Sequence, residues 1–385
     1  MWKYKSQTLI SAIGLAIGFT CFALATLWIV YEMTFDSFHK NAKQMYVVYT
    51  SPLFSFFDAN SSRSTGYALA ANLKETFPEI ANAIPLSPGS RQGKFTVDEV
   101  EISAMTIRAD SSFLRMFDVK ILEGSLDFLI HGSSKIAITH EKAKQLFGNE
   151  NPIGKMINNG GNEICAVVSG MSKHSNYAFD FISPFRVQQA YTSYGEHTII
   201  ELLPGINVEA FEKKLYEHDF SAGGRISRNL TIKPITKIRY LDQNIVREVK
   251  FQHIFIFAIS GLLVILCSLF NYLTLFMSRF RMRQKELALR VVCGASGSSL
   301  LAMLSIEFIL TLLFAIVLGC CLTQIVHIPF LTLSEIQMEL PAIYRESLIY
   351  IGGIILVSLL VFWLILIIFQ RRSLNVSIWG KIPRL

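Results

Sequence analysis

Four long apolar segments divide this 385-residue chain, over residues 8–31, 254–277, 299–322 and 350–369. A helix rises about 1.5 Å per residue, so each segment is long enough to cross the roughly 30 Å hydrocarbon core of a bilayer. The last segment is the shortest, but it carries no charge. The pattern therefore predicts a protein with four transmembrane helices.

Between the first and second spans, over residues 32–252, the pattern becomes that of a water-soluble domain. Short runs of alternating or buried-type residues predict strands, and runs with a helical period predict amphipathic helices. The predicted strands are 45–49, 95–103, 135–139 and 230–235, with a hairpin over 157–168, and the predicted helices are 68–77, 140–147 and 208–218. Because strands and helices do not alternate regularly, we expect an α+β domain inserted between the first two membrane helices.

Charge fixes the expected orientation. Eleven Lys and Arg residues and one acid, Glu286, lie in the N-terminus (1–7), the loop 278–298 and the tail 370–385, whereas residues 32–252 hold 24 basic and 24 acidic residues. Positive loops face the cytoplasm. We therefore expect both termini and 278–298 to be cytoplasmic, with 32–252 and the loop 323–349 outside. The net charge of +7 then reflects topology, and no nucleic-acid partner is expected.

The cysteines argue against a disulfide framework. Of six, only Cys165 lies in the predicted external domain, where it has no partner. The first apolar segment could also be a cleaved signal peptide, because Ala23 and Ala25 have suitable small side chains. Its apolar run continues to Val30, however, so an uncleaved span is the favoured interpretation.

The loop 278–298 has an ordered sequence as well as a positive charge. Read as a helix, it places Glu286 four residues before Arg290 in the favourable orientation for an ion pair. Gly294 is suited to end that helix, and Ser296 to cap the next one. Such a segment could bind a lipid surface, remain a solvated loop, or fit a groove on a soluble partner.

Small and polar residues mark three of the spans. Gly14 and Gly18 have the spacing that lets two helices approach closely, either within one chain or between subunits. Asn271 and Glu307 are polar side chains in otherwise apolar helices. A carboxylate in a membrane helix is a candidate functional group, although Glu307 could also simply bond across helices or reach Arg290.

No catalytic or metal-binding pattern is present. The nearest match to a phosphate-binding loop, residues 148–156, has Asn149 in place of the first glycine and Met156 in place of the hydroxyl residue. The histidines lack the spacing of metal ligands, and no other catalytic motif occurs. We therefore predict neither catalytic residues nor a metal site, and a membrane-anchored enzyme is the least favoured function.

Four stretches together resemble the FtsX/MacB-like permeases of bacterial ABC transporters, and in particular the branch abundant in Bacteroidetes. They are IGLAIG (13–18), YEMTFDSFHKNAKQMY (31–46), AITHEKAKQLFGNENPIGK (137–155) and RQKELALRVVCGAS (283–296). The resemblance implies a non-catalytic inner-membrane subunit whose external part is a MacB-like periplasmic core domain. It also implies mechanotransmission, in which a cytoplasmic ATPase moves that domain.

The resemblance implies several partners. These are a cytoplasmic ABC ATPase dimer, a second permease half that is identical or different, membrane lipid, and an adaptor or hydrolase outside the membrane. The ATPase would use ATP and Mg²⁺, whereas this chain itself would bind no cofactor. The stretch 283–296 is similar to a family coupling helix that docks on the ATPase. The residues expected to form this docking segment are Arg283, Gln284, Lys285, Glu286, Leu287, Leu289, Arg290, Gly294 and Ser296.

Two departures from the family pattern stand out. Only residues 2–7 precede the first span, where relatives carry a basic amphipathic helix, and the chain has the length of one four-span half. Family members export or extract periplasmic substrates such as antimicrobial peptides, macrolides or lipoproteins, and efflux of this kind is the expected function. The alternative is an FtsX-like scaffold that regulates a cell-wall hydrolase outside the membrane.

Overall fold

A computed structural model describes residues 5–50, 63–87, 93–97, 100–158, 160–185, 194–218, 220, 229–241, 251–283, 286, 289–290, 292–334, 352–353, 356, 360 and 363–364. The chain forms two compact units. Residues 1–31 and 252–385 make a helical unit, and residues 32–251 make an external unit.

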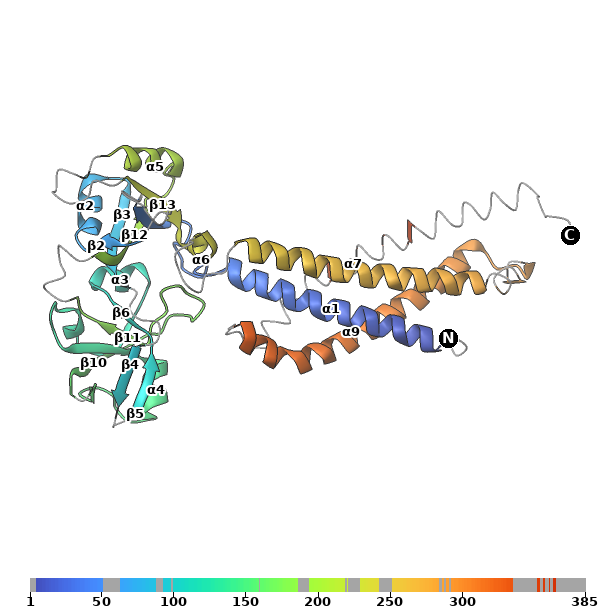
Figure 1. The fold of residues 1–385 in the computed structure, drawn as a ribbon, viewed down its shortest axis with the longest axis horizontal. Helices are drawn as coiled ribbons and strands as arrows, with labels where there is room; N and C mark the ends of the chain where they lie inside the picture. Colours follow the sequence, from blue (N-terminus) through green and yellow to red (C-terminus); the bar gives the residue numbers. More distant parts are fainter. Residues whose placement is uncertain are drawn as a thin grey trace, which may run out of the picture. The chain divides into compact units, whose positions relative to one another are not determined.

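Three long helices dominate the helical unit (Figure 1): α1 (Lys5–Met33), α7 (Phe251–Met282) and α9 (Gly297–Ser334). Within the described residues, each contains a stretch long and apolar enough to cross a membrane, over Leu9–Met33, Ile254–Ser278 and Ser298–Thr332. Their shared interior is lined by Leu15, Phe19, Ile265, Tyr272, Phe276, Leu304, Phe308, Leu312 and Ala315. These helices correspond to the first three predicted spans.

The third helix is longer than the sequence predicts. It continues past residue 322 to Ser334, with Pro329 inside it, so the first part of the predicted loop 323–349 is helical. A helix of 38 residues is about 57 Å long, well beyond the roughly 30 Å thickness of the hydrocarbon core. The helix α9 therefore extends past the residues that are needed to cross a membrane. Residues 335–349 lie outside the described residues.

The predicted fourth span, 350–369, falls largely outside the described residues. Only six of its positions are described, and all six are helical: Gly352, Gly353, Leu356, Leu360, Trp363 and Leu364. A fourth membrane helix therefore stays a prediction, as does the cytoplasmic placement of the tail 370–385.

In the external unit, one sheet has the strand order β13-β1-β12-β2, and β3 also pairs with β12. Its pairings are all antiparallel. The strands are β1 (Met45–Thr50), β2 (Thr65–Gly66), β3 (Ile80–Leu86), β12 (Tyr194–Leu202) and β13 (Leu230–Pro234). Helices α2 (Leu69–Thr76) and α5 (Val208–Glu217) cover one face, with Leu73 and Phe211 buried against it.

A second sheet has the order β6-β11-β8-β10-β7, with β9 also paired to β10. The β8–β10 and β6–β11 pairs are parallel and the others antiparallel. The strands are β6 (Thr106–Arg108), β7 (Ile121–Gly124), β8 (Lys135–Thr139), β9 (Met156–Ile157), β10 (Asn162–Val168) and β11 (Phe181–Ser183). Helix α4 (His140–Phe147) follows β8 and ends at Gly148, whose φ of 62° suits glycine.

The two sheets share one interior, so the external unit is a single α+β body, as the sequence predicts. Its largest buried cluster joins Val47, Ile84 and Ile199 of the first sheet to Ala137 and Ile182 of the second. The remaining short elements are α3 (Ser111–Met116), η2 (Asp127–Leu129), η5 (Ile235–Lys237) and α6 (Ile238–Leu241).

One strand prediction is wrong. Residues 95–103 form two antiparallel strands, β4 (Gly93–Val97) and β5 (Val100–Ala104), in which Val97 faces Val100 and Phe95 faces Ile102. The apolar positions skip from 97 to 100, and this break in the alternation marks the change of strand direction.

Candidate coupling segment and external pocket

The segment that follows α7 forms a short, capped helical turn. Glu286, Leu289, Arg290 and Val292 are helical, whereas Gln284, Lys285 and Leu287 lie outside the described residues. Gly294 ends the turn at a φ of 93°, and the Ala295 N–H donates to the Arg290 carbonyl at 2.9 Å. This hydrogen bond and the left-handed glycine are those of a Schellman cap.

The next helix is capped as the sequence predicts. The Ser296 hydroxyl accepts a hydrogen bond from the Ser299 N–H at 3.2 Å, at the start of α9. Serine at this position satisfies a backbone donor that the helix itself leaves free. The segment is therefore fixed at its end by two local caps, separated by one residue.

Glu286 is held between two arginines. Arg290 Nη2 donates to Glu286 Oε1 at 3.1 Å, which is the predicted pairing, and Arg283 Nε lies 3.5 Å from Glu286 Oε2. The Arg283 guanidinium, followed by Arg290, lowers the pKa of Glu286 below its usual range. Glu286 and Arg290 are both half exposed, so this pairing organises the surface more than it stabilises the fold.

Glu307 pairs with Arg283. The Arg283 Nη1 group donates to Glu307 Oε2 at 2.9 Å, and both side chains are mostly buried, at 22% and 17% exposure. The pair connects the end of α7 to α9, so the carboxylate bonds across helices. The sequence also named Arg290 as a possible partner of Glu307. In the structure, Arg290 Nη1 lies 3.5 Å from the sulfur of Met303.

The segment presents apolar side chains beside these charges. Leu289 is 65% exposed and Val292 is 84% exposed. An exposed helical turn with both apolar and paired charged side chains is suited to a groove on a protein partner.

The predicted glycine pair packs against α7 of the same chain. A Cβ atom at Gly18 would lie 2.4 Å from Ser268 Oγ, whereas one at Gly14 would lie 3.7 Å from Asn271 Nδ2. Thr20 adds a hydrogen bond from its Oγ1 to the Gly319 carbonyl of α9, at 3.1 Å. Gly18 therefore packs against a helix of its own chain, and a subunit interface at the glycine pair stays a prediction. Asn271 lies beside Gly14 in this arrangement.

A buried ion pair in the external unit was not predicted from the sequence. Arg239 Nε and Nη2 donate to the two carboxylate oxygens of Glu32 at 2.5 and 3.1 Å, and the Glu32 side chain is only 2% exposed. The guanidinium carbon also lies 3.8 Å from the centre of the Phe35 ring. The sequence indicates it only weakly, in that residues 31–39 mix aromatic rings with charges.

Asp36 forms a second buried connection. It is fully buried, with a φ of 56°, and accepts hydrogen bonds from the Ser175 hydroxyl and from Asn176 Nδ2, the latter at 2.7 Å. The Asp36 N–H donates to the His174 carbonyl at 3.2 Å. These bonds fasten the loop around residue 175 to the chain that follows α1.

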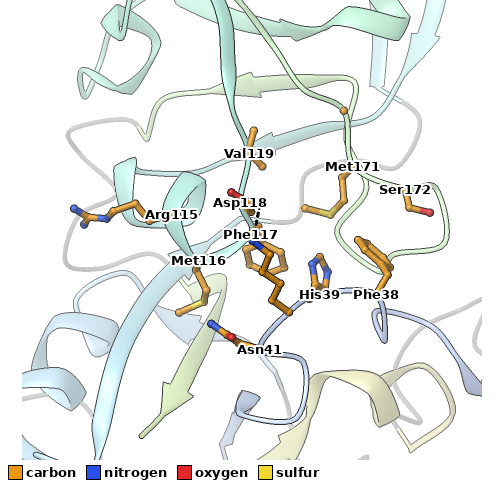
Figure 2. Close-up of a pocket in the computed structure, with 12 residues that line it drawn as sticks. Phe38, His39, Asn41, Arg115, Met116, Phe117, Asp118, Val119, Met171 and Ser172 are labelled. Atoms are coloured by element: carbon orange, nitrogen blue, oxygen red, sulfur yellow. Dashed lines mark ion pairs between the residues drawn. The ribbon is translucent and has the colours of Figure 1, made fainter. Parts of the chain in front are cut away.

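A cavity of about 520 Å³ opens beside this connection (Figure 2). Its walls come from residues 38–41, the end of α3 through Val119, and residues 170–172, and they include Phe38, Phe117 and Met171. Lys40 and Asp118 form an exposed ion pair at 3.8 Å. Asp110 caps α3 through hydrogen bonds from the Ser112 and Phe113 N–H groups, and burial raises its pKa. The volume is that of a small-molecule site, but the lining does not indicate a ligand class.

Two family models match the chain. A MacB-like periplasmic core domain matches residues 8–217, and an FtsX-like permease C-terminal domain matches residues 258–378. A search of curated proteins found no match.

Three solved structures are similar to the external part. A permease-protein domain from Porphyromonas gingivalis is 17% identical over 51% of this chain and 92% of its own, with a TM-score of 0.42. The periplasmic region of MacB from Actinobacillus actinomycetemcomitans is 19% identical over 54% of this chain and 95% of its own, with a TM-score of 0.39. The extracellular domain of the ABC-type transporter YknZ from Gram-positive bacteria is 14% identical over 49% of this chain and 99% of its own, with a TM-score of 0.37.

Proposed function

Because this chain belongs to the FtsX/MacB-like permease family, we propose that it is the membrane subunit of a bacterial ABC transporter. In this role it couples ATP hydrolysis by a separate cytoplasmic ATPase to movement of its own external domain. The chain itself binds no nucleotide, and ATP and Mg²⁺ act in the partner. It resides in the inner membrane with both termini in the cytoplasm, and it works with a second permease half.

One observation carries this proposal. The turn from Glu286 to Gly294 is capped at its end, presents Leu289 and Val292 to solvent, and holds Glu286 between two arginines. A loop that served only to set topology would need the positive charges but neither the cap nor the exposed apolar residues. The arrangement fits a docking surface for the ATPase.

The proposed cargo is a substrate already outside the membrane, such as an antimicrobial peptide, a macrolide or a lipoprotein-like molecule. The second candidate is an FtsX-like scaffold whose moving domain activates a cell-wall hydrolase. Both functions need the same docking surface, and they differ only in what the external unit contacts.

The docking surface can be tested with Glu286→Lys, Leu289→Ala and Arg290→Glu combined in the full-length chain. Arg283 is left intact, because it forms an ion pair with Glu307 of α9. We expect recovery of the ATPase with the purified chain to fall at least about tenfold, as for the loss of interface anchors. Lys213→Glu, at an exposed position of α5, is the matched charge-reversal control.

Unchanged recovery of the ATPase from the triple variant would remove the docking assignment. If recovery falls and export of a cargo falls with it, the transporter function is supported. If recovery of the ATPase falls, export of cargo stays the same, and a hydrolase co-purifies with the external domain, the scaffold function is supported.

A further inference from the structure

Arg283, the first residue of the proposed docking segment, pairs both with Glu286 of that segment and with Glu307 of α9. Its Nε lies 3.5 Å from Glu286 in the segment, and its Nη1 donates to Glu307 of α9 at 2.9 Å. Arg283 itself directly follows the last residue of α7, Met282. One side chain therefore connects the end of α7 and the adjoining docking segment to α9.

A second contact lies on the same face of α9. Arg290 Nη1 lies 3.5 Å from the sulfur of Met303, and Met303 precedes Glu307 by four residues, or about one helical turn. The two arginines therefore hold the same side of α9 one turn apart.

The residue after Glu307 lies in the interior of the helical unit. Phe308 is fully buried, and its ring centre lies 5.2 Å from that of Tyr272 on α7. The main chain around residue 307 thus connects the ion pair directly to the packed core. Because close-packed interiors transmit strain, we expect a displacement at Glu307 to reach this core.

We propose that the Arg283–Glu307 pair is the link through which the docking segment moves α9. The proposal rests on the function proposed above. It assigns a positioning role to Arg283 and Glu307, so that a push on the segment moves α9 as well as α7. Among the described residues, the segment also reaches α9 through Ser296, which caps that helix, and through the weaker contact of Arg290 with Met303.

Four variants of the full-length chain separate this role from simple stabilisation. Arg283→Gln takes this ion pair away from Glu307, whereas Glu307→Gln leaves Arg283 with Glu286 at 3.5 Å. Removing one member of a mostly buried pair destabilises the fold. Combining the two changes removes both charges and so relieves that destabilisation. Exchanging the residues, with Arg283→Glu and Glu307→Arg, keeps an ion pair of reversed direction.

The readout follows α9 directly. Ile328, 65% exposed near the outer end of α9, is changed to cysteine in a chain whose native cysteines are replaced, and a bimane fluorophore is attached. The labelled chain is reconstituted with its ATPase, and emission is compared before and after ATP, Mg²⁺ and vanadate. Thr274→Ala is the control, because among the described residues that hydroxyl donates to the Phe270 carbonyl of its own helix.

We expect the ATP-dependent emission change to shrink about fivefold or more in both single variants and in the double glutamine variant. The ATPase should still co-purify with each of them. The exchanged pair should recover most of the change, and Thr274→Ala should respond as the unaltered chain does.

Two results would overturn the proposal. One is a normal emission change in either single variant, and the other is recovery in the double glutamine variant, which would show that only the unpaired charge mattered. If the unaltered chain neither binds an ATPase nor responds to ATP, the proposed function itself fails, and the link fails with it.

Discussion

Arg239 and Glu32 form a buried ion pair in which both carboxylate oxygens accept a hydrogen bond. Changing Arg239 to alanine leaves the carboxylate of Glu32 buried and unpaired. We expect this change to lower the free energy of unfolding of the external unit by roughly 3–5 kcal/mol. The measure is maleimide labelling of Cys165, which is buried and is the only cysteine within residues 32–251.

A matched control separates this pair from ordinary surface pairs. Lys213 and Glu217 lie 3.9 Å apart with exposures of 77% and 64%, so Lys213→Ala should cost less than about 1 kcal/mol. Replacing both members, as in Glu32→Leu with Arg239→Met, should cost less than Arg239→Ala alone. Equal Cys165 labelling rates in Arg239→Ala and Lys213→Ala would contradict the prediction.

His197 makes the external unit sensitive to acid. Burial, followed by the charge of Arg63, lowers the pKa of His197 from 6.5 to about 3. Between these values the unfolded chain binds a proton that the folded chain does not, so stability falls as the pH drops below 6.5. From pH 7 to 5.5 we expect a loss of about 1 kcal/mol.

Cys165 labelling at the two pH values measures this loss, and His197→Gln should reduce the difference between them. Other groups titrate between pH 7 and 5.5 in the unaltered chain and in His197→Gln alike, so only the difference between the pH profiles of these two proteins bears on His197. Identical pH profiles for the two proteins would contradict the assignment.

Among the elements, the contact between α1 and α7 depends on Gly18. A Cβ atom at this position would lie 2.7 Å from the Cβ of Ser268, closer than such atoms approach, whereas Gly14 has room for one. Gly18→Ala should therefore lower the stability of the detergent-solubilised protein by about 1–3 kcal/mol, the usual cost of overpacking.

Gly14→Ala is the matched control and should have little effect. Gly18→Ala combined with Ser268→Gly should recover part of the loss, because it removes the atoms with which the new methyl group collides. Thermal denaturation of all three variants in the same detergent provides the comparison. Equal midpoints for Gly18→Ala and Gly14→Ala would show that this helix contact is absent.

For the whole molecule, the charge distribution predicts the side of the membrane on which each unit lies. A membrane-impermeant maleimide added to intact spheroplasts should label Lys213→Cys in the external unit but not Cys293, which is exposed in the docking segment. After lysis both should react. Labelling of Cys293 in intact spheroplasts would reverse the predicted orientation.

The same experiment tests the fourth span. Lys381→Cys lies beyond it in the sequence. If residues 350–369 cross the membrane, position 381 should be labelled only after lysis, as Cys293 is. Labelling in intact spheroplasts would place the C-terminus outside.

Elements whose causes are local can be predicted from the sequence alone. Apolar runs mark α1, α7 and α9 because a helix in a bilayer must cover its own backbone with apolar side chains. The ends at Gly148 and Gly294 and the cap at Ser296 were predicted because they depend on residues within one turn. Residues 95–103 form β4 and β5 where the sequence predicts one strand, because the apolar alternation shifts by only one residue between Val97 and Val100.

Which distant residues meet depends on how the whole chain folds. Glu32 and Arg239 are 207 positions apart, and Arg283 could have met any of several acids. Gly18 could have faced another subunit, but it lies against Ser268 of its own chain. Local sequence cannot select among such partners, because the free energy of each contact depends on how the whole chain brings the two side chains together and removes them from water.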